Sequence, residues 1–321
     1  MKGPLYIDSD FIETNTDFHE LVEVLRTAFS QNITVVPQRH HHDFSNPGKA
    51  RQNTLLLMPA CNPGEDMGVK VVTINPHNGD FDLPAIQGSY LYSDAVNGQL
   101  KAIIEAKSLT AKRTAATSAL ASKFLSREDS DSLLMIGTGV LARNLIWAHA
   151  AVRPIKSVYV WGRNFNKAKD MVNEFNGSSF SLMAVADLEK VISDVSIISC
   201  ATLSETPLVF GTDLSPGQHI DLVGAYKPNM RESDDSAVER SSVFLDSYQG
   251  GLKESGDIVI PLKTGVLKVD DIRADLFELC SGYKQGRNSR NEITLFKSVG
   301  HALEDLAAAN YYHQNYIHDH L

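Results

Sequence analysis

The chain has 321 residues and a formal net charge of −9, with 43% hydrophobic and 21% charged residues. This length predicts two domains, and the acidic balance argues against nucleic-acid binding, which needs clustered lysines and arginines. No apolar run reaches the roughly 18 residues of a membrane span, and the N-terminus lacks the apolar core of a signal peptide. Cys61, Cys200 and Cys280 are far apart and lack metal spacing, which predicts reduced thiols in a cytoplasmic protein.

The first part of the chain mixes helical and strand patterns. Apolar residues recur at helical spacing over residues 17–30, after the candidate cap Asp17. Turn residues separate four runs that predict strands, "ITVVPQRH", "TLLLMPA", "GVKVVTI" and "GSYLYSDA". The alanine-rich residues 110–126 predict a long helix. Together these patterns indicate an α+β domain with a meander-like sheet.

Beyond this helix, strands and helices alternate. The strands are "SLLMIGTG", "SVYVWGR", "FSLMAVA", "VSIISCAT", "QHIDLVGA" and "SSVFLDS", and the first three helices between them are "VLARNLIWAHAAV", "NKAKDMVNEF" and "DLEKVISD". Such alternation predicts an α/β fold with a parallel, doubly wound sheet. Residues 293–321 predict a single helix running to the C-terminus. We therefore expect domains at 1–118 and 119–302, with the helix at 303–321 returning to the first domain.

A glycine motif follows the first strand of the second domain and opens a helix, which is the context of a dinucleotide-binding loop. In this Gly137-x-Gly139-x-x-Ala142 pattern, Gly137 permits a tight turn and Gly139 lets a pyrophosphate approach the backbone. The helix N-terminus supplies amide donors. The predicted contacts within this loop are Gly137, Thr138, Gly139, Val140 and Leu141. The alternative is a βα turn without a ligand.

The next strand ends in Gly162, Arg163 and Asn164, where sites that prefer NAD usually carry an acid. A guanidinium binds phosphate through charge-assisted hydrogen bonds, so Arg163 predicts a preference for NADPH, with Asn164 beside the cofactor. If Arg163 only stacks on the adenine, NADH also binds. Ala201 and Thr202 end a later strand and are expected to border the cofactor.

Six stretches of the sequence resemble one known family. They are "GVKVVT", "LTAKRTAATSALAS", "IGTGVLA", "SCATLSETP", "DLVGAYKPNMRE" and "ITLFKSVGHALEDLAAA", and they are collinear from about residue 35 to 310. The chain is thereby similar to the ornithine cyclodeaminase/μ-crystallin family. The resemblance implies a Rossmann-type nucleotide domain, and a first domain that supplies the substrate pocket and the contact of a homodimer.

The resemblance also implies site residues. Lys70 matches the family's pocket lysine, and Arg39 and Arg113 match its arginines facing substrate carboxylate and cofactor. The chemistry agrees, because arginine clamps a carboxylate with two hydrogen bonds and a buried lysine changes its pKa readily. An ammonium near an imine nitrogen would keep it protonated while hydride reaches the carbon. Further cofactor contacts implied are Arg113, Thr114, Val223, Gly224, Ala225 and Gly300. The alternatives are a solvated Lys70 and a surface Arg113.

The segment "DLVGAYKPNMRE" selects the reaction. Cyclodeaminases and related alanine dehydrogenases carry an aspartate where this chain has Tyr226, and no carboxylate lies between Asp221 and Glu232. Asp221 is expected inside the preceding strand. Ornithine cyclisation needs repeated proton transfers, whereas reducing a preformed imine needs hydride, a carboxylate clamp and one proton. We therefore predict NAD(P)H-dependent reduction of Δ1-pyrroline-2-carboxylate to L-proline, with Δ1-piperideine-2-carboxylate as a second substrate.

Two other activities remain open, ornithine cyclodeamination or alanine-dehydrogenase-type chemistry, and non-catalytic binding as in the crystallin. Degradation of hydroxyproline would suit the family as a pathway. The histidines His40–His42 alternate in direction on a strand, so no metal site is predicted, although one could face the pocket beside Arg39. Residues 298–300 are expected to close over the nicotinamide, or to begin a helix capped by Ser298.

Overall fold

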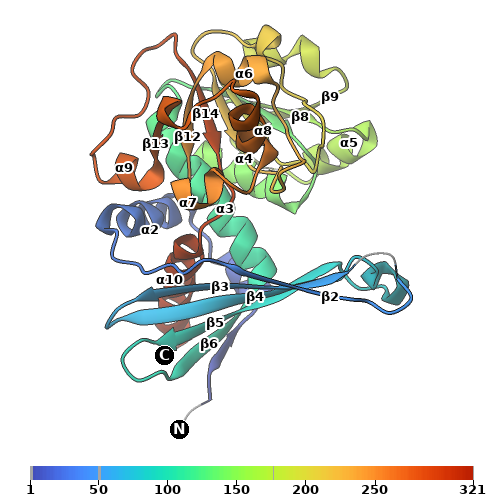
Figure 1. Cartoon of the computed structure of the whole chain (residues 1–321). Coiled ribbons are helices and arrows are strands. Elements are labelled where there is room, and N and C mark those ends of the chain that lie inside the picture. Colours follow the sequence, from blue (N-terminus) through green and yellow to red (C-terminus); the bar gives the residue numbers. More distant parts are fainter. Residues whose placement is uncertain (1–2, 50–51, 176, 321) are drawn as a thin grey trace. The chain divides into compact units, whose positions relative to one another are not determined.

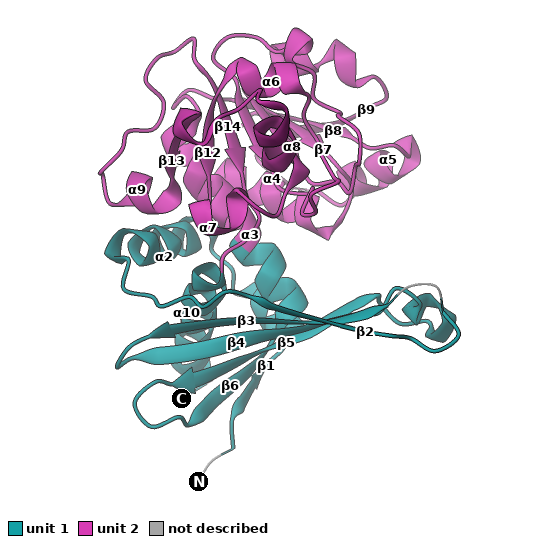
Figure 2. Ribbon diagram, in the orientation of Figure 1, with its two compact units in different colours: residues 1–113, 302–321 teal, residues 114–301 magenta. Residues whose placement is uncertain are grey.

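The computed structural model describes residues 3–49, 52–175 and 177–320. The chain divides into two compact units (Figure 2), unit 1 comprising Met1–Arg113 with Ala302–Leu321 and unit 2 comprising Thr114–His301. Helix α3 (Ala106–Leu125) contains the division, which falls a few residues before the predicted boundary at 118. The predicted α/β class, a parallel-sheet unit beside a second sheet unit, is confirmed.

Unit 1 contains a six-stranded sheet in the order β1-β6-β5-β4-β3-β2 (Figure 1). Neighbouring strands from β2 to β6 pair antiparallel in chain order, as a meander does, and β1 pairs parallel with β6. The strands are β1 (Leu5–Ile7), β2 (His40–Phe44), β3 (Asn53–Asn62), β4 (Asp66–Ile74), β5 (Ile86–Asp94) and β6 (Leu100–Glu105), with a 3₁₀ turn at Asn78–Phe81.

The helices of unit 1 are α1 (Ser9–Thr14), α2 (Phe18–Gln31), the first turns of α3, and α10 (Ala302–His320). Helix α2 begins where predicted, because the Asp17 carboxylate accepts hydrogen bonds from the backbone N–H groups of His19 and Glu20. Helix α10 packs on α2 and on strands β3 and β4. The C-terminal segment therefore covers the sheet built by the first part of the chain.

Unit 2 contains an eight-stranded parallel sheet in the order β13-β12-β14-β11-β10-β7-β8-β9. The strands are β7 (Ser132–Ile136), β8 (Ser157–Trp161), β9 (Ser181–Val185), β10 (Ile197–Cys200), β11 (His219–Leu222), β12 (Ser241–Leu245), β13 (Ile272–Asp275) and β14 (Ile293–Lys297). The helices are α4 (Val140–Val152), α5 (Phe165–Asn173), α6 (Asp235–Glu239), α7 (Tyr248–Gly251), α8 (Gly256–Thr264) and α9 (Leu276–Cys280). Buried aliphatic residues fill the strands, which is usual for a sheet covered on both faces.

The four central strands of unit 2 end in register. Ile136, Cys200, Leu222 and Lys297 are the last residues of β7, β10, β11 and β14, and neighbouring strands pair them directly. The residues that follow them in sequence therefore share one edge of the sheet. Ligands of such sheets bind outside this carboxyl edge.

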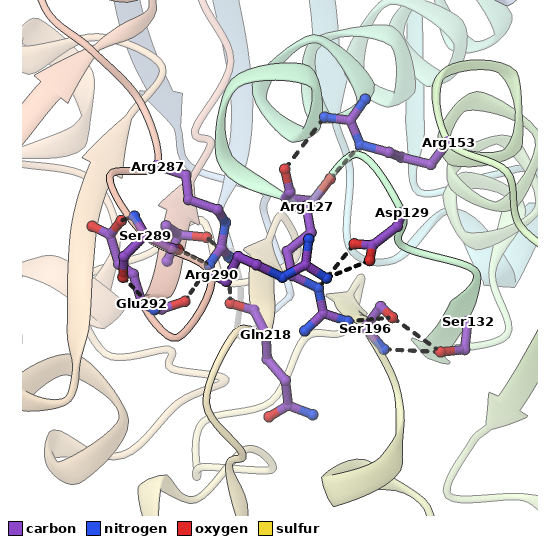
Figure 3. A network of polar contacts seen from close by, with 12 residues as sticks. Arg127, Asp129, Ser132, Arg153, Ser196, Gln218, Arg287, Ser289, Arg290 and Glu292 are labelled. Carbon is purple, nitrogen blue, oxygen red and sulfur yellow. Dashed lines mark hydrogen bonds and ion pairs between the residues drawn. The ribbon is translucent and has the colours of Figure 1, made fainter.

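A network of arginines occupies the opposite, amino edge of the same sheet (Figure 3). Arg287 donates to the backbone oxygens of Leu125 and Gln218, at 2.7 and 2.9 Å. Arg153 donates to the Ser126 hydroxyl at 2.7 Å. The network ties the end of α3 to the residues preceding the strands.

Three predicted elements are wrong. Residues 293–321 are not one helix, because "ITLFK" forms the buried strand β14 and α10 begins only at Ala302. The run "ITVVPQRH" does not form one strand: Val35 makes an isolated bridge to Cys61, and only the last residue, His40, belongs to a strand, β2. Pro37 in this run has no N–H to donate. The segment "DLEKVISD" forms two short 3₁₀ turns, Leu188–Lys190 and Ile192–Asp194, in place of an α-helix.

Candidate active site

Lys70 is a buried lysine on β4 whose ammonium contacts an acid of α10. It pairs with Met58 on β3 and Tyr90 on β5, and it is 3% exposed. Its Nζ lies 2.9 Å from Oδ1 and 2.8 Å from Oδ2 of Asp305. The Thr110 hydroxyl oxygen lies 3.4 Å from the same Nζ. Lys70 is therefore not a solvated charge at a strand edge.

Arg113, on α3, shares the Asp305 carboxylate with Lys70. Its Nε donates to Oδ1 of Asp305 at 2.8 Å, and its Nη1 donates to Oε2 of Glu304 at 2.5 Å. Both acids are fully buried in the first turn of α10. We call Lys70, Arg113, Glu304 and Asp305 the buried charge cluster. Removing one member would leave a partner unpaired, which typically costs about 3–5 kcal/mol.

The cluster leaves Lys70 with a proton that it can release near neutral pH. Burial lowers the pKa of Lys70 to about 8, although the attraction of Asp305 opposes the change. The positive charges of Arg113 and Arg39 lower this pKa further. Burial acts to raise the pKa of Asp305, but Arg113 and Lys70 outweigh it and hold that pKa below its usual value. A buried ammonium beside an ionised aspartate results.

Arg39 precedes β2 and is half-buried, unlike Arg113. Its charge acts on Lys70, so the three predicted cations of unit 1 lie in one electrostatic neighbourhood. His41 is also near Arg39. Burial makes the largest contribution to lowering the pKa of His41, and the positive charge of Arg39 lowers it further. The structure thus brings Arg39, Lys70 and Arg113 together, with Arg39 the most exposed of the three to solvent.

No carboxylate side chain lies between Asp221 and Glu232 in the sequence. Tyr226 is 41% exposed. Asp221 lies inside β11, as predicted, and is fully buried. Its oxygens accept hydrogen bonds from the hydroxyls of Ser118 and Ser199, at 2.9 and 2.7 Å, and one lies 3.2 Å from His149 Nε2. The Asp221 carboxylate is therefore bound to buried polar groups inside unit 2.

The glycine loop of unit 2 fits a dinucleotide. Gly137 has a φ of +129°, and a Cβ there would lie 2.6 Å from the Ala201 backbone oxygen. Gly139 is the N-cap of α4 and makes no side-chain cap, and a Cβ added to it would meet no atom of the described residues within 4 Å. The loop thus offers uncapped helix N–H groups and open backbone, which suit a pyrophosphate. Thr138 is half-buried, Val140 exposed and Leu141 half-buried.

The residues after β8 pack against this loop. A Cβ on Gly162 would lie 2.7 Å from the Thr138 methyl carbon, so only glycine allows the approach. Arg163 is exposed. Asn164 is the N-cap of α5, and its Oδ1 accepts from the N–H groups of Asn166 and Lys167. The Asn164 side chain therefore caps α5, a role that the sequence analysis did not predict for it.

Glu232, which ends the motif "DLVGAYKPNMRE" but was not predicted as a site residue, joins two loops of the carboxyl edge. It accepts from the N–H and hydroxyl of Thr202, both at 2.7 Å, and from the N–H groups of Gly224 and Ala225. Burial raises the pKa of Glu232 to about 7, and Lys297 opposes the rise. The predicted residues Thr202, Gly224 and Ala225 are thus held by one carboxylate. Ala201 and Val223 directly precede these loops.

Asp246 holds the turn before α10 in the same manner. Its Oδ2 accepts from the Ser298 hydroxyl and from the N–H groups of Val299 and Gly300. Gly300 has a φ of +82°, a backbone conformation that glycine adopts without strain. Ser298 is therefore a partner of Asp246, and the alternative interpretation of Ser298 as a helix cap is wrong because α10 starts four residues later. Thr114 is buried on α3.

Glu304 and Asp305 were also missed. They stand in "HALEDLAAA", where two adjacent acids lie in an otherwise apolar helix start. Two acids among apolar residues that face a core indicate buried charges, and buried charges need oppositely charged partners. The sequence offers no hint of which cations they meet.

Neither a metal centre nor a membrane span occurs in the described part of the chain. No group of three or more His, Cys, Asp or Glu that could hold a metal ion occurs among residues 3–49, 52–175 and 177–320. Over the same ranges, each helix is too short or too polar to cross a membrane.

A family model for the ornithine cyclodeaminase/mu-crystallin family matches residues 8–320. A Δ1-pyrroline-2-carboxylate reductase of Colwellia psychrerythraea is 36% identical over 95% of this chain and 96% of its own length.

Two solved structures have the same fold. One is a Thermococcus litoralis Δ1-pyrroline-2-carboxylate reductase in complex with NADH and L-proline, with 33% identity, a TM-score of 0.91 and 98% of each chain covered. The other is an archaeal alanine dehydrogenase dimer with bound NAD, with 26% identity, a TM-score of 0.90, and 99% of this chain and 97% of that chain covered.

Proposed function

The chain belongs to the ornithine cyclodeaminase/mu-crystallin family, and from this premise we propose that it reduces Δ1-pyrroline-2-carboxylate to L-proline with a nicotinamide cofactor. The protein is an oxidoreductase acting on a C=N bond. The observation that carries the mechanism is Lys70, an ammonium buried against Asp305 whose pKa lies at about 8. Such a group donates a proton at neutral pH and recovers it from solvent.

Reduction of the substrate requires a group that binds its carboxylate, a proton for its nitrogen and a hydride for its imine carbon. Arg39 binds the carboxylate, since Arg113 already shares its charge with two acids. Bound nicotinamide supplies the hydride. Lys70 gives its proton to the imine nitrogen, and the C=N double bond becomes the C–N single bond of proline. Arg113 holds the acid that orients Lys70.

Cofactor contacts are assigned to unit 2 and substrate contacts to unit 1. The glycine loop of residues 137–141, with its uncapped helix start, supports a pyrophosphate site. The loops held by Glu232 and Asp246 support placing Thr202, Gly224, Ala225 and Gly300 beside the cofactor, at the edge where parallel strands end. Thr114, Ala201 and Val223 complete the set.

NADPH is the proposed preferred cofactor, with NADH also accepted. Arg163 is exposed beyond the end of β8, and within the described part of the chain it forms no ion pair or hydrogen bond. A guanidinium in that position suits a 2′-phosphate. The Thermococcus reductase was solved with NADH, which supports use of either nicotinamide.

Other activities of the family suit the site less well. Cyclisation of ornithine would need a base where Tyr226 stands, and Asp221 is hydrogen-bonded inside the sheet. The buried charge cluster, with its titratable lysine, argues against a purely binding role. Δ1-Piperideine-2-carboxylate, one ring carbon larger, is the proposed second substrate.

The cellular setting and the assembly follow from other features. We place the enzyme in the cytoplasm, since its three cysteines stand far apart in the sequence and lack the spacing of a disulfide frame or a metal site. The archaeal alanine dehydrogenase is a dimer, which supports a homodimer. We propose a role in hydroxyproline degradation, in which loss of water from a hydroxyproline, with no oxidant needed, would supply the cyclic imine.

The test is cofactor oxidation with Δ1-pyrroline-2-carboxylate, beside L-ornithine with NAD and pyruvate with ammonia, using NADPH and NADH in parallel. Rapid oxidation with the cyclic imine alone is expected. Proline formed from ornithine would overturn the proposal and show that another carboxylate replaces the missing aspartate.

A further inference from the structure

We propose that Asp305 is a positioning residue for the reduction, which holds Lys70 protonated and aimed, while the adjacent Glu304 serves Arg113. This inference rests on the proposed function. It concerns a residue that touches neither substrate nor cofactor in the mechanism above and acts through Lys70.

The geometry separates the two adjacent acids. The Asp305 carboxylate lies within 2.9 Å of Lys70 Nζ through both of its oxygens, and Oδ1 also accepts from Arg113 Nε. Glu304 accepts from Arg113 Nη1 at 2.5 Å. One helix turn thus presents two fully buried acids, and Asp305 is the one that bridges both cations.

The charged residues near Lys70 come from three segments of unit 1. Arg39 lies before β2, Arg113 on α3, and Glu304 and Asp305 on α10. Tyr90 faces Lys70 from β5. Burial raises the pKa of Tyr90 well above its usual value, and the Asp305 charge adds to the rise, so its phenol stays neutral.

Asp305 keeps the ammonium charged against these forces. Burial and two arginines favour loss of the Lys70 proton, while the Asp305 charge and hydrogen bond oppose that loss. Glu304 pairs with Arg113, whose pKa stays far above neutral. Replacing Asp305 by asparagine should therefore bring the pKa of Lys70 below about 8, and replacing Glu304 by glutamine should leave it nearly unchanged.

The experiment compares kcat/KM for cyclic imine reduction, as a function of pH, in wild type, Asp305→Asn, Asp305→Glu and Glu304→Gln. Wild type should lose activity as pH rises through about 8, when the ammonium deprotonates. Asp305→Asn should shift this midpoint down by one pH unit or more, which lowers the rate at pH 8 about fivefold or more. Asp305→Glu, which keeps the charge, should restore the midpoint. Glu304→Gln is the matched control, since it neutralises an equally buried acid one residue away, and its midpoint should stay with the wild type.

A second measurement follows Lys70 without turnover. Competitive labelling with acetic anhydride over a pH series, read by peptide mass spectrometry, gives the pKa of each labelled lysine. A lower Lys70 pKa in Asp305→Asn than in Glu304→Gln supports the inference, even if the wild type reduces no cyclic imine and the proposed function fails. Equal midpoints in both variants, by activity and by labelling, would overturn it and leave Asp305 as an ion-pair partner with no effect on the lysine proton.

Discussion

The buried charge cluster of unit 1 and the arginine network of unit 2 compensate their positive charges by different means. In the buried charge cluster of unit 1, Lys70 and Arg113 meet the carboxylates of Glu304 and Asp305. In the network of unit 2, Arg153 and Arg287 donate mainly to backbone and hydroxyl oxygens (Figure 3). The first group is a set of buried ion pairs, whereas Arg153 and Arg287 of the second group bind uncharged oxygens.

In the network of unit 2, Arg153 caps the C-terminal end of helix α3. Arg153 Nη2 donates to the backbone oxygens of Ser122 and Lys123, at 2.8 and 2.9 Å, near the end of α3. A helix leaves its last carbonyl groups without partners, and an arginine that reaches them satisfies several at once. Burial lowers the pKa of Arg287 to about 10, so it keeps its charge at neutral pH.

The difference shows which group can take part in chemistry. Arginine bound to carbonyl oxygens has no proton to exchange near neutral pH, and its loss is felt as stability. Lysine between an acid and two arginines has a pKa close to neutral, so its loss should lower the reaction rate in addition to its cost in stability. Four substitutions test this contrast, taken from the largest expected effect to the smallest.

Lys70→Met should abolish most turnover. Methionine keeps much of the apolar stem and removes the ammonium, so the cyclic imine loses its proton donor and kcat should fall about 10³-fold. Cofactor binding, which we assign to unit 2, should persist in a nicotinamide fluorescence titration. Near-normal kcat in a variant that binds the cofactor normally would remove Lys70 from the mechanism.

This lysine also shows how far the sequence alone could lead. Its position inside a strand was visible, and so was its match to a family motif. Its partner Asp305 is 235 residues away, and no local pattern connects them. The glycine loop is the opposite case, because Gly137, Gly139 and the start of α4 are neighbours in sequence and their spacing carries the geometry.

The secondary-structure elements show the same difference between local patterns, which the sequence reveals, and distant contacts, which it does not. Helix α4 was predicted with its observed bounds, because its apolar residues recur over three turns after a glycine turn. Strand β14 was missed, because the four apolar or β-branched residues at 293–296, just before a long helix, are equally compatible with either structure. Its neighbours β11 and β12, distant in sequence, decide the matter by pairing with it on both sides.

Arg287→Met should lower stability without touching chemistry. The change leaves the Gln218 carbonyl without its arginine donor and removes one of the donors to Leu125, which should reduce the free energy of unfolding by about 2 kcal/mol. Urea unfolding measures this loss, and kcat with the cyclic imine at low temperature should equal that of wild type. Arg287→Lys is the control for charge, since lysine lacks the fork of donors and should recover little. A large fall in kcat in folded protein would contradict the contrast between the units.

Arg163→Ser examines a third use of arginine, as an exposed group facing a ligand. If Arg163 binds a 2′-phosphate, the KM for NADPH should rise about tenfold while that for NADH changes little. The measurement is the ratio of kcat/KM for the two cofactors. Equal losses with both would indicate that Arg163 stacks on the adenine.

Arg290→Ala should have the smallest effect, although Arg290 makes one of the shortest ion pairs of the network. Its Nη2 lies 2.5 Å from Asp129, but the two side chains are 76% and 54% exposed, so water and salt screen the pair. The hydrogen bond from Arg290 holds the pKa of Asp129 below 3.8, so any stabilisation is present above about pH 4 and is lost as pH falls further. The thermal midpoint at neutral pH should match that of wild type within error, at low and at high salt. A clear fall in the thermal midpoint at low salt that disappears at high salt would contradict this prediction. It would mean that the exposed Arg290–Asp129 pair stabilises the fold as the buried arginines of the network do.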